Sequence, residues 1–118
     1  MKMPLSEIID RYTITLLKSE RTEEDVSEEL EAYKKELPDT DIAQNFIDRM
    51  YEINGKLWDT EGDIRKGVDM PLEEVGRLAI KVRELNQIRN GIKGEIVDKF
   101  AEGFKEIKVN YKKIDYGR

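Results

Sequence analysis

Two long stretches of this chain place apolar residues in alternating steps of three and four, and this repeat most constrains the fold. Such steps put the apolar side chains on one helix face, and a sustained repeat is typical of helices that pack along a seam. The steps run through Phe46, Met50, Ile53, Leu57, Thr60 and Ile64, and then through Leu72, Val75, Leu78, Val82, Leu85, Arg89, Ile92 and Ile96.

Only residues 67–70 separate the two stretches, so we expect the second helix to fold back on the first. The sequence therefore predicts an antiparallel helical hairpin over residues 41–66 and 71–102. The residues expected inside the hairpin are Phe46, Met50, Ile53, Leu57, Val82, Leu85 and Ile92.

Two shorter amphipathic segments precede the hairpin and are expected to close the bundle. One covers residues 4–20, and the next is expected to begin at a Thr22 cap and to stop before Pro38. The predicted fold is all-α: an antiparallel helical bundle built on a long helical hairpin. Residues 1–118 are expected to form a single helical domain, with the bundle over 1–103 and a basic arm over 104–118.

The C-terminal arm differs from the bundle in period and in charge. Ile107, Val109 and Tyr111 alternate with polar residues, which indicates a short strand or an extended segment. Residues 104–118 carry a net charge of +3, whereas the remainder carries −8 of the total of −5. The negative remainder disfavours nucleic acid as a partner, and docking on an acidic neighbouring subunit is preferred. Folding back on its own bundle, or disorder, is the alternative for this arm.

The composition excludes several kinds of chemistry. The chain has neither cysteine nor histidine, which excludes disulfides, Cys/His zinc sites and Ser-His-Asp triads. No cofactor is indicated. No apolar run approaches the roughly 18 residues of a membrane span, and no signal-peptide core is present, so we expect a cytoplasmic location without membrane contact.

Carboxylates remain available for metal chemistry. Helical nucleotide pyrophosphohydrolases hold Mg²⁺ with acidic residues three apart, because such residues share a helix face. This chain offers such pairs, but 26 acidic residues among 118 would give roughly 5 to 6 of them by chance. Examples are Glu7 with Asp10, Glu20 with Glu23, Glu28 with Glu31, and Glu95 with Asp98. A small Mg²⁺-dependent phosphohydrolase is therefore the alternative function and not the first choice.

Three sequence blocks stand out, in order, between residues 5 and 96. They are Glu-x-x-Asp-Arg within residues 5–14, Leu-Trp-x-x-Glu within residues 57–65, and Asn-x-x-Arg at residues 86–89, followed by Lys93. In order and spacing the chain resembles a family of uncharacterised small helical proteins of bacteria and phages. It departs from the family pattern at Ser6, Arg11, Gly62 and Gln87-Ile88. The resemblance implies a helical fold and no activity.

Several polar residues in these blocks lie on or beside the predicted apolar stripes. A charged side chain at such a position needs a partner of opposite charge or a carbonyl, which favours an ion network across helices. We expect Asp10 or Glu61 to pair with Arg65 or Arg89. The alternative is an anion pocket with Arg65, Arg89 and Lys93 as donors and Trp58 as a wall. The candidate residues of either site are Asp10, Trp58, Glu61, Arg65, Asn86, Arg89 and Lys93.

The preferred function is a non-catalytic interaction or assembly module that acts as a homo-oligomer. The long last helix is expected to leave apolar surface that a second copy covers, and two-fold symmetry is the commonest closure, so a dimer is favoured. The sequence names no other protein partner.

Overall fold

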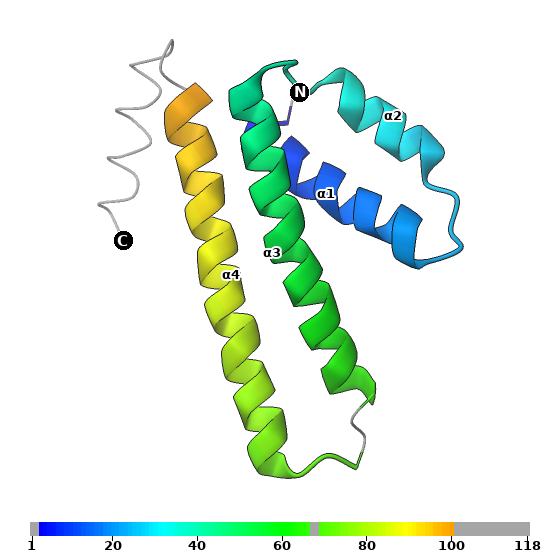
Figure 1. The fold of residues 1–118 in the computed structure, drawn as a ribbon, viewed down its shortest axis with the longest axis vertical. Helices are drawn as coiled ribbons and strands as arrows, with labels where there is room; N and C mark the ends of the chain where they lie inside the picture. Colours follow the sequence, from blue (N-terminus) through cyan, green and yellow to red (C-terminus); the bar gives the residue numbers. More distant parts are fainter. Residues whose placement is uncertain (1–2, 67–68, 101–118) are drawn as a thin grey trace.

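The computed structural model describes residues 3–66 and 69–100, and within these ranges the regular structure is entirely helical. The helices are α1 (Leu5–Arg21), α2 (Ser27–Lys35), α3 (Asp41–Lys66) and α4 (Leu72–Phe100). Figure 1 shows α3 and α4 side by side and antiparallel, with α1 and α2 on the other flank of α3. The all-α prediction and the helical hairpin are confirmed.

The bounds of the hairpin follow local chemistry. Thr40 caps α3, because its Oγ1 accepts a hydrogen bond from the Ala43 backbone N–H at 3.1 Å. Pro71 precedes α4, and its carbonyl accepts bonds from the backbone N–H groups of Glu74 and Val75 at 3.0 and 3.1 Å. α3 covers the predicted range 41–66, whereas α4 begins one residue later than expected, and residues 101 and 102 lie outside the described ranges.

The core lies between α1, α3 and the C-terminal two-thirds of α4. Of the residues expected inside, all are buried except Val82, which is half-buried against the same cluster. Leu72 belongs to the predicted apolar stripe, but the structure leaves it 87% exposed. The last buried residue of α3 is Thr60, so no buried part of α3 lies beside the first turn of α4 to cover Leu72.

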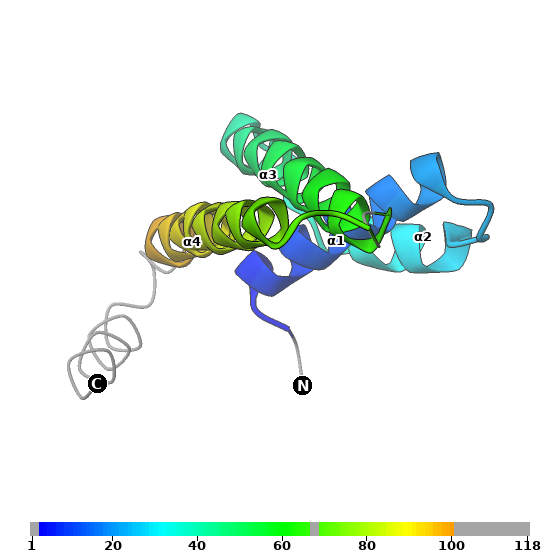
Figure 2. The ribbon, with the colours of Figure 1, turned by 90° about the horizontal axis from the view of Figure 1, so that it is seen from below.

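α1 crosses one face of the hairpin, and α2 lies beyond α1, away from α4 (Figure 2). The prediction that the second helix starts at Thr22 is wrong. Thr22 ends α1 instead, where its backbone N–H and its hydroxyl both donate to the Lys18 carbonyl, at 3.0 and 2.7 Å. Asp25 then accepts the backbone N–H of Ser27 at 3.1 Å, so α2 starts at Ser27. No α2 residue is fully buried.

Within residues 3–66 and 69–100, no helix is both long enough and apolar enough to cross a membrane. The arm predicted over residues 104–118 lies outside the described residues.

Candidate functional site

The candidate site begins with a polar stripe on the buried face of α1. Ser6, Asp10 and Thr13 follow one another at steps of four and three and are 7%, 1% and 0% exposed. Residues at these steps share one helix face, and the stripe continues into Leu17. Because this stripe lies on the buried face of α1, it places the Asp10 carboxylate in the interior, where a charged group requires hydrogen-bond partners.

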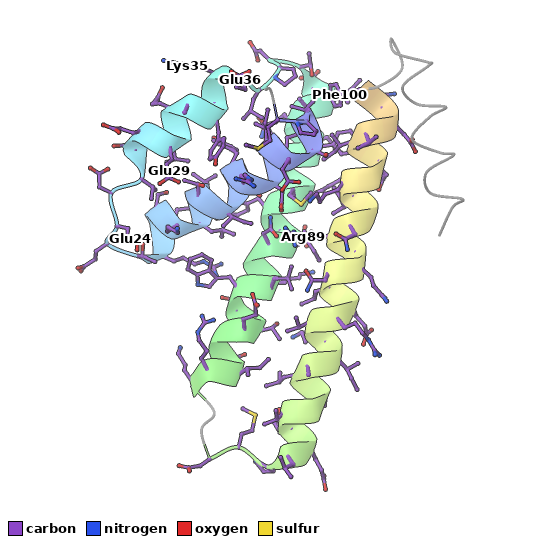
Figure 3. All side chains as sticks on the ribbon, turned by 180° about the vertical axis from the view of Figure 1, so that it is seen from behind. Glu24, Glu29, Lys35, Glu36, Arg89 and Phe100 are labelled. Atoms are coloured by element: carbon purple, nitrogen blue, oxygen red, sulfur yellow. The ribbon has the colours of Figure 1, made fainter. Side chains whose placement is uncertain are left out.

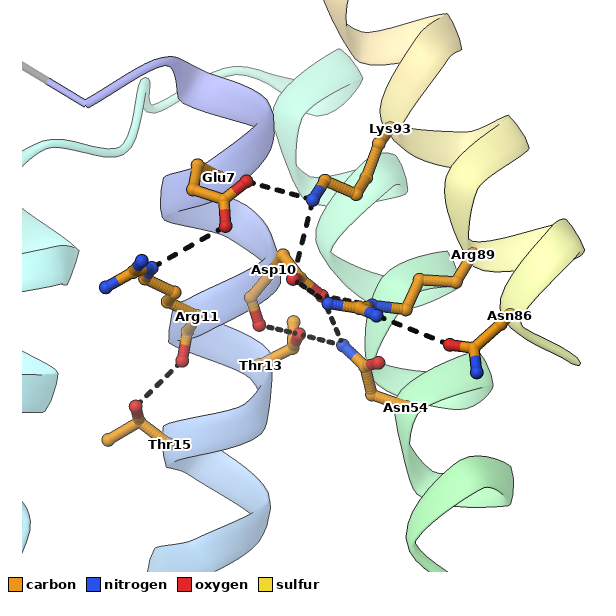
Figure 4. A network of polar contacts seen from close by, with 9 residues as sticks. All are labelled: Glu7, Asp10, Arg11, Thr13, Thr15, Asn54, Asn86, Arg89 and Lys93. Carbon is orange, nitrogen blue, oxygen red and sulfur yellow. Dashed lines mark hydrogen bonds and ion pairs between the residues drawn. The ribbon is translucent and has the colours of Figure 1, made fainter. Parts of the chain in front are cut away.

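Asp10 receives those partners from two other helices. Arg89 of α4 binds it through two nitrogens: Nε lies 2.9 Å from Oδ1 and Nη2 lies 2.5 Å from Oδ2. Asn54 of α3 donates from Nδ2 to Oδ1 at 3.0 Å. Figure 4 shows these contacts converging from α1, α3 and α4 on one carboxylate, and Figure 3 shows Arg89 within the whole molecule. Two parallel N–H···O bonds fix the guanidinium in orientation as well as in distance.

The neighbours of this pair complete the hydrogen bonding. Asn54 Nδ2 also donates to Thr13 Oγ1 at 2.9 Å, and the Thr13 hydroxyl donates to the Asp10 carbonyl at 2.8 Å. Asn86 Oδ1 lies 3.4 Å from Arg89 Nη1. Among the described residues, no buried side-chain nitrogen or oxygen lacks a hydrogen-bond partner. The interior polar groups are therefore satisfied, as a stable buried cluster requires.

A second ion pair lies beside the first, nearer the surface. Lys93 Nζ is 2.9 Å from Glu7 Oε2 and 3.9 Å from Asp10 Oδ2, so one cation faces two carboxylates. Arg11 is 3.7 Å from the other oxygen of Glu7, and its side chain is half exposed. We call Glu7, Asp10, Thr13, Asn54, Asn86, Arg89 and Lys93 together the Asp10 network. Its two acids and two bases balance in charge.

The pKa values follow from these contacts. Burial alone raises the pKa of Asp10, but the hydrogen bonds from Arg89 and Asn54 and the nearby positive charges outweigh it, so the pKa lies below its usual value. The hydrogen bond from Lys93 likewise lowers the pKa of Glu7. The hydrogen bonds to Asp10 raise the pKa of Arg89 against the effect of burial. The network is thus held in its charged form.

The structure brings four of the seven candidate residues into this network: Asp10, Asn86, Arg89 and Lys93. Trp58 and Glu61 line an adjoining cavity of about 330 Å³ between α1, α3 and α4, which we call the Trp58 cavity. Its other lining residues are Ile14, Asn54, Leu57, Asn86 and Arg89. Glu61 is exposed and acts on Arg89 only through its charge.

Arg65 does not join the other candidates. Its side chain is exposed in the last turn of α3, and within residues 3–66 and 69–100 it forms no ion pair. The reason is the path of α1, which crosses α3 near Asn54. Arg65 lies eleven residues further along α3, about 16 Å away. Of the pairings expected between Asp10 or Glu61 and Arg65 or Arg89, the structure contains that of Asp10 with Arg89.

Two of the three donors of the hypothetical anion pocket, Arg89 and Lys93, are already engaged, and the third, Arg65, lies apart from them. An anion at Arg89 would have to displace Asp10 from a two-nitrogen contact, and an anion at Lys93 would have to displace Glu7. Within the described residues, no group of three or more acidic side chains is placed to hold a metal ion. The geometry favours the ion network over the anion pocket, because each charge is matched inside the protein.

Sequence reasoning missed three members of the network: Glu7, Thr13 and Asn54. Thr13 carried a signal, because it lies between Ile9 and Leu17 at steps of four on the buried face of α1. Asn54 follows Ile53 at the edge of the α3 seam, where the sequence does not distinguish an amide that faces a third helix from one that faces water.

Comparisons with protein-family models, with curated proteins and with solved structures found no match to this chain.

Proposed function

We propose that this protein is a non-catalytic helical interaction module that works as a homo-oligomer, with a two-fold dimer as the favoured form. The observation that carries the proposal is exposed apolar surface on α4. Ile80 is 49% exposed and Ile88 is 53% exposed. Eight residues separate them, which turns the helix about 80° beyond two full turns, so Ile80 lies away from the core and Ile88 lies on the flank beside Leu85 and Ile92. Large apolar side chains exposed on neighbouring parts of one helix are typical of an interface.

The surroundings of Ile88 support a second copy as the partner. A hollow of about 320 Å³ adjoins it, with Ile53, Leu85 and Ile92 as the apolar lining. The rim carries both signs of charge, with Arg49 and Lys56 beside Glu52 and Glu95. A two-fold interface brings a patch against its own copy, so a mixed rim is complementary to itself.

The Asp10 network supports a scaffold and not a reacting site. Its charges are paired across three helices, and its donors are occupied by its own acceptors. A small Mg²⁺-dependent phosphohydrolase stays the alternative hypothesis, and no feature of the described residues favours it. Titration of the full chain with Mg²⁺ in a calorimeter tests this alternative. Saturable binding at micromolar Mg²⁺ would support the phosphohydrolase hypothesis.

Light scattering on the full chain tests the proposed assembly. We expect a mass twice the 13.8 kDa of one chain at tens of micromolar, where a micromolar dimer is mostly assembled. Replacing both Ile80 and Ile88 by Lys should shift the protein to monomer at that concentration. Ile42→Lys is the matched control, because Ile42 is 46% exposed but lies on α3. A monomeric wild type would contradict the proposed function.

A further inference from the structure

A second groove lies on the flank of α3 that faces away from α4. It has a volume of about 490 Å³ and opens between α1, the end of α2 and the N-terminal half of α3. Tyr12 and Leu16 of α1, Leu37 after α2, and Ile47 of α3 form its apolar lining. A groove of this size with an apolar floor is large enough for several side chains of a bound segment. We call it the acidic groove.

The rim of this groove is mainly negative. Glu20, Asp39 and Asp48 border it, against the single cation Lys34. The Tyr51 hydroxyl donates to Glu20 within the rim. Figure 3 shows Glu24 in the loop before α2, Glu29 on α2, and Glu36 at its C-terminal end beside Lys35, so three further acids lie along this segment. The apolar floor favours apolar side chains and the acidic rim favours basic ones. A segment in which apolar and basic residues alternate would therefore fit the groove.

The chain itself contains such a segment. In residues 104–118, Ile107, Val109 and Tyr111 alternate with polar residues, and the net charge is +3. Fifteen extended residues span up to about 50 Å, which is ample to cross the groove. The described chain ends on the α4 side of α3, where the Phe100 ring lies 6.2 Å from that of Phe46, and the groove residue Ile47 is the next residue along α3.

We propose that the acidic groove binds the basic C-terminal segment, residues 104–118, of a second copy of this chain. The apolar residues of the segment would enter the groove, and its lysines would meet Glu20, Asp39 and Asp48. One part of this proposal rests on the proposed homo-oligomer, namely that the segment comes from a second copy. The complementarity of groove and segment is independent of that choice.

A disulfide introduced into the full chain tests this contact directly, because the native sequence has no cysteine. The variant carries Asp48→Cys in the groove rim and Lys112→Cys in the segment. We expect oxidation to give a covalent dimer on a non-reducing gel. The control combines Lys112→Cys with Asp63→Cys, which is also exposed and also on α3 but about 22 Å further along the helix. The control should stay largely uncoupled.

The three outcomes separate the inference from the proposed function. A covalent dimer specific to the Asp48 variant supports both. A disulfide within one chain supports the groove as the binding site but overturns exchange between copies. If neither forms while light scattering still shows a dimer, the inference is overturned and the proposed homo-oligomer stands.

A charge exchange provides an independent readout on the full chain. Replacing Asp39 and Asp48 by Lys should weaken association by about tenfold, because two exposed charge pairs turn repulsive. Replacing Lys112 and Lys113 by Glu should weaken it by a similar factor, and combining the two exchanges should restore most of the affinity. Asp63→Lys is the control and should leave association unchanged. Independent losses that add in the combined variant would overturn the proposal.

Discussion

The hairpin has two halves that differ in how they are packed. α1 crosses one of them, which we call the covered half, and the other, which we call the turn half, ends in the turn between α3 and α4. In the covered half, α3 residues 43–60 and α4 residues 85–100 pack with α1 as a third helix, and the Asp10 network joins all three. In the turn half, α3 residues 61–66 face α4 residues 72–82 without α1, and Leu78 is the one fully buried residue described there.

This difference shows what a third helix adds to a two-helix seam. Ile64, Val75 and Val82 follow the same repeat as the core residues but remain half-buried. A two-helix seam covers only a narrow stripe, so side chains at its edges stay in contact with water. We infer that the covered half provides most of the stability and that the turn half opens more easily.

Removal of the central carboxylate should have the largest effect. Asp10→Ala leaves Arg89 without its partner in a half-buried site, and breaking a buried pair from one side costs about 3 to 5 kcal/mol. Urea unfolding of wild type and variant measures this loss. Asp63→Ala, on the exposed face of α3 in the turn half, is the control and should change stability by less than about 0.5 kcal/mol. Equal losses in both variants would remove the distinction between the halves.

The repeat predicted the hairpin and most of its core because burial along a helix seam depends on spacing alone. The repeat does not show that Leu72 is exposed, because the spacing of apolar residues does not reveal where the buried part of the neighbouring helix ends. The prediction of a cap at Thr22 failed for another reason: a hydroxyl can form a hydrogen bond at the end of one helix as well as at the start of the next. For the site, charged residues on apolar stripes revealed Asp10 and Arg89. The choice of Arg89 over Arg65, and the part of Asn54, depend on where α1 crosses, which no local pattern encodes.

Truncation of apolar side chains should give the next largest contrast. Leu85 is 8% exposed in the core, and Leu85→Ala should cost about 2 to 5 kcal/mol through lost burial and the cavity left behind. Leu72→Ala removes the same atoms from a residue that is 87% exposed, and should cost less than about 0.5 kcal/mol. Thermal melts of both variants measure the difference. A melting temperature unchanged by Leu85→Ala would place that residue outside the core.

Acidification should weaken the covered half selectively. The pKa of Asp10 lies below its unfolded value of about 3.9, so the folded state binds protons less readily than the unfolded state. Its contribution to stability is therefore complete above about pH 4 and is lost as the pH falls through the folded pKa. The lowered pKa of Glu7 acts in the same direction.

We expect the unfolding free energy of the wild type to fall more steeply below about pH 4 than that of Asp10→Asn, which keeps an oxygen acceptor but has no charge to lose. Urea unfolding at a series of pH values provides the comparison. Parallel curves for the two proteins would show that Asp10 does not contribute to the acid response.

The smallest expected effect is a gain in stability in the turn half. Gly76 lies inside the exposed part of α4, and a Cβ added there would meet nothing within 4 Å. Gly76→Ala should therefore stabilise the helix by about 0.4 to 1 kcal/mol, chiefly because alanine loses less backbone freedom on folding. If the turn half opens by itself, native-state hydrogen exchange should show this gain in the amides of residues 76–82, while those around Arg89 stay unchanged. Gly55→Ala is the matched change in the covered half, where a Cβ would touch Arg21 and Leu17 at ordinary contact distances of 3.5 and 3.8 Å. A gain from Gly76→Ala that spreads equally to the amides of both halves would show that the hairpin opens as one unit, and that α1 does not divide it into regions of different stability.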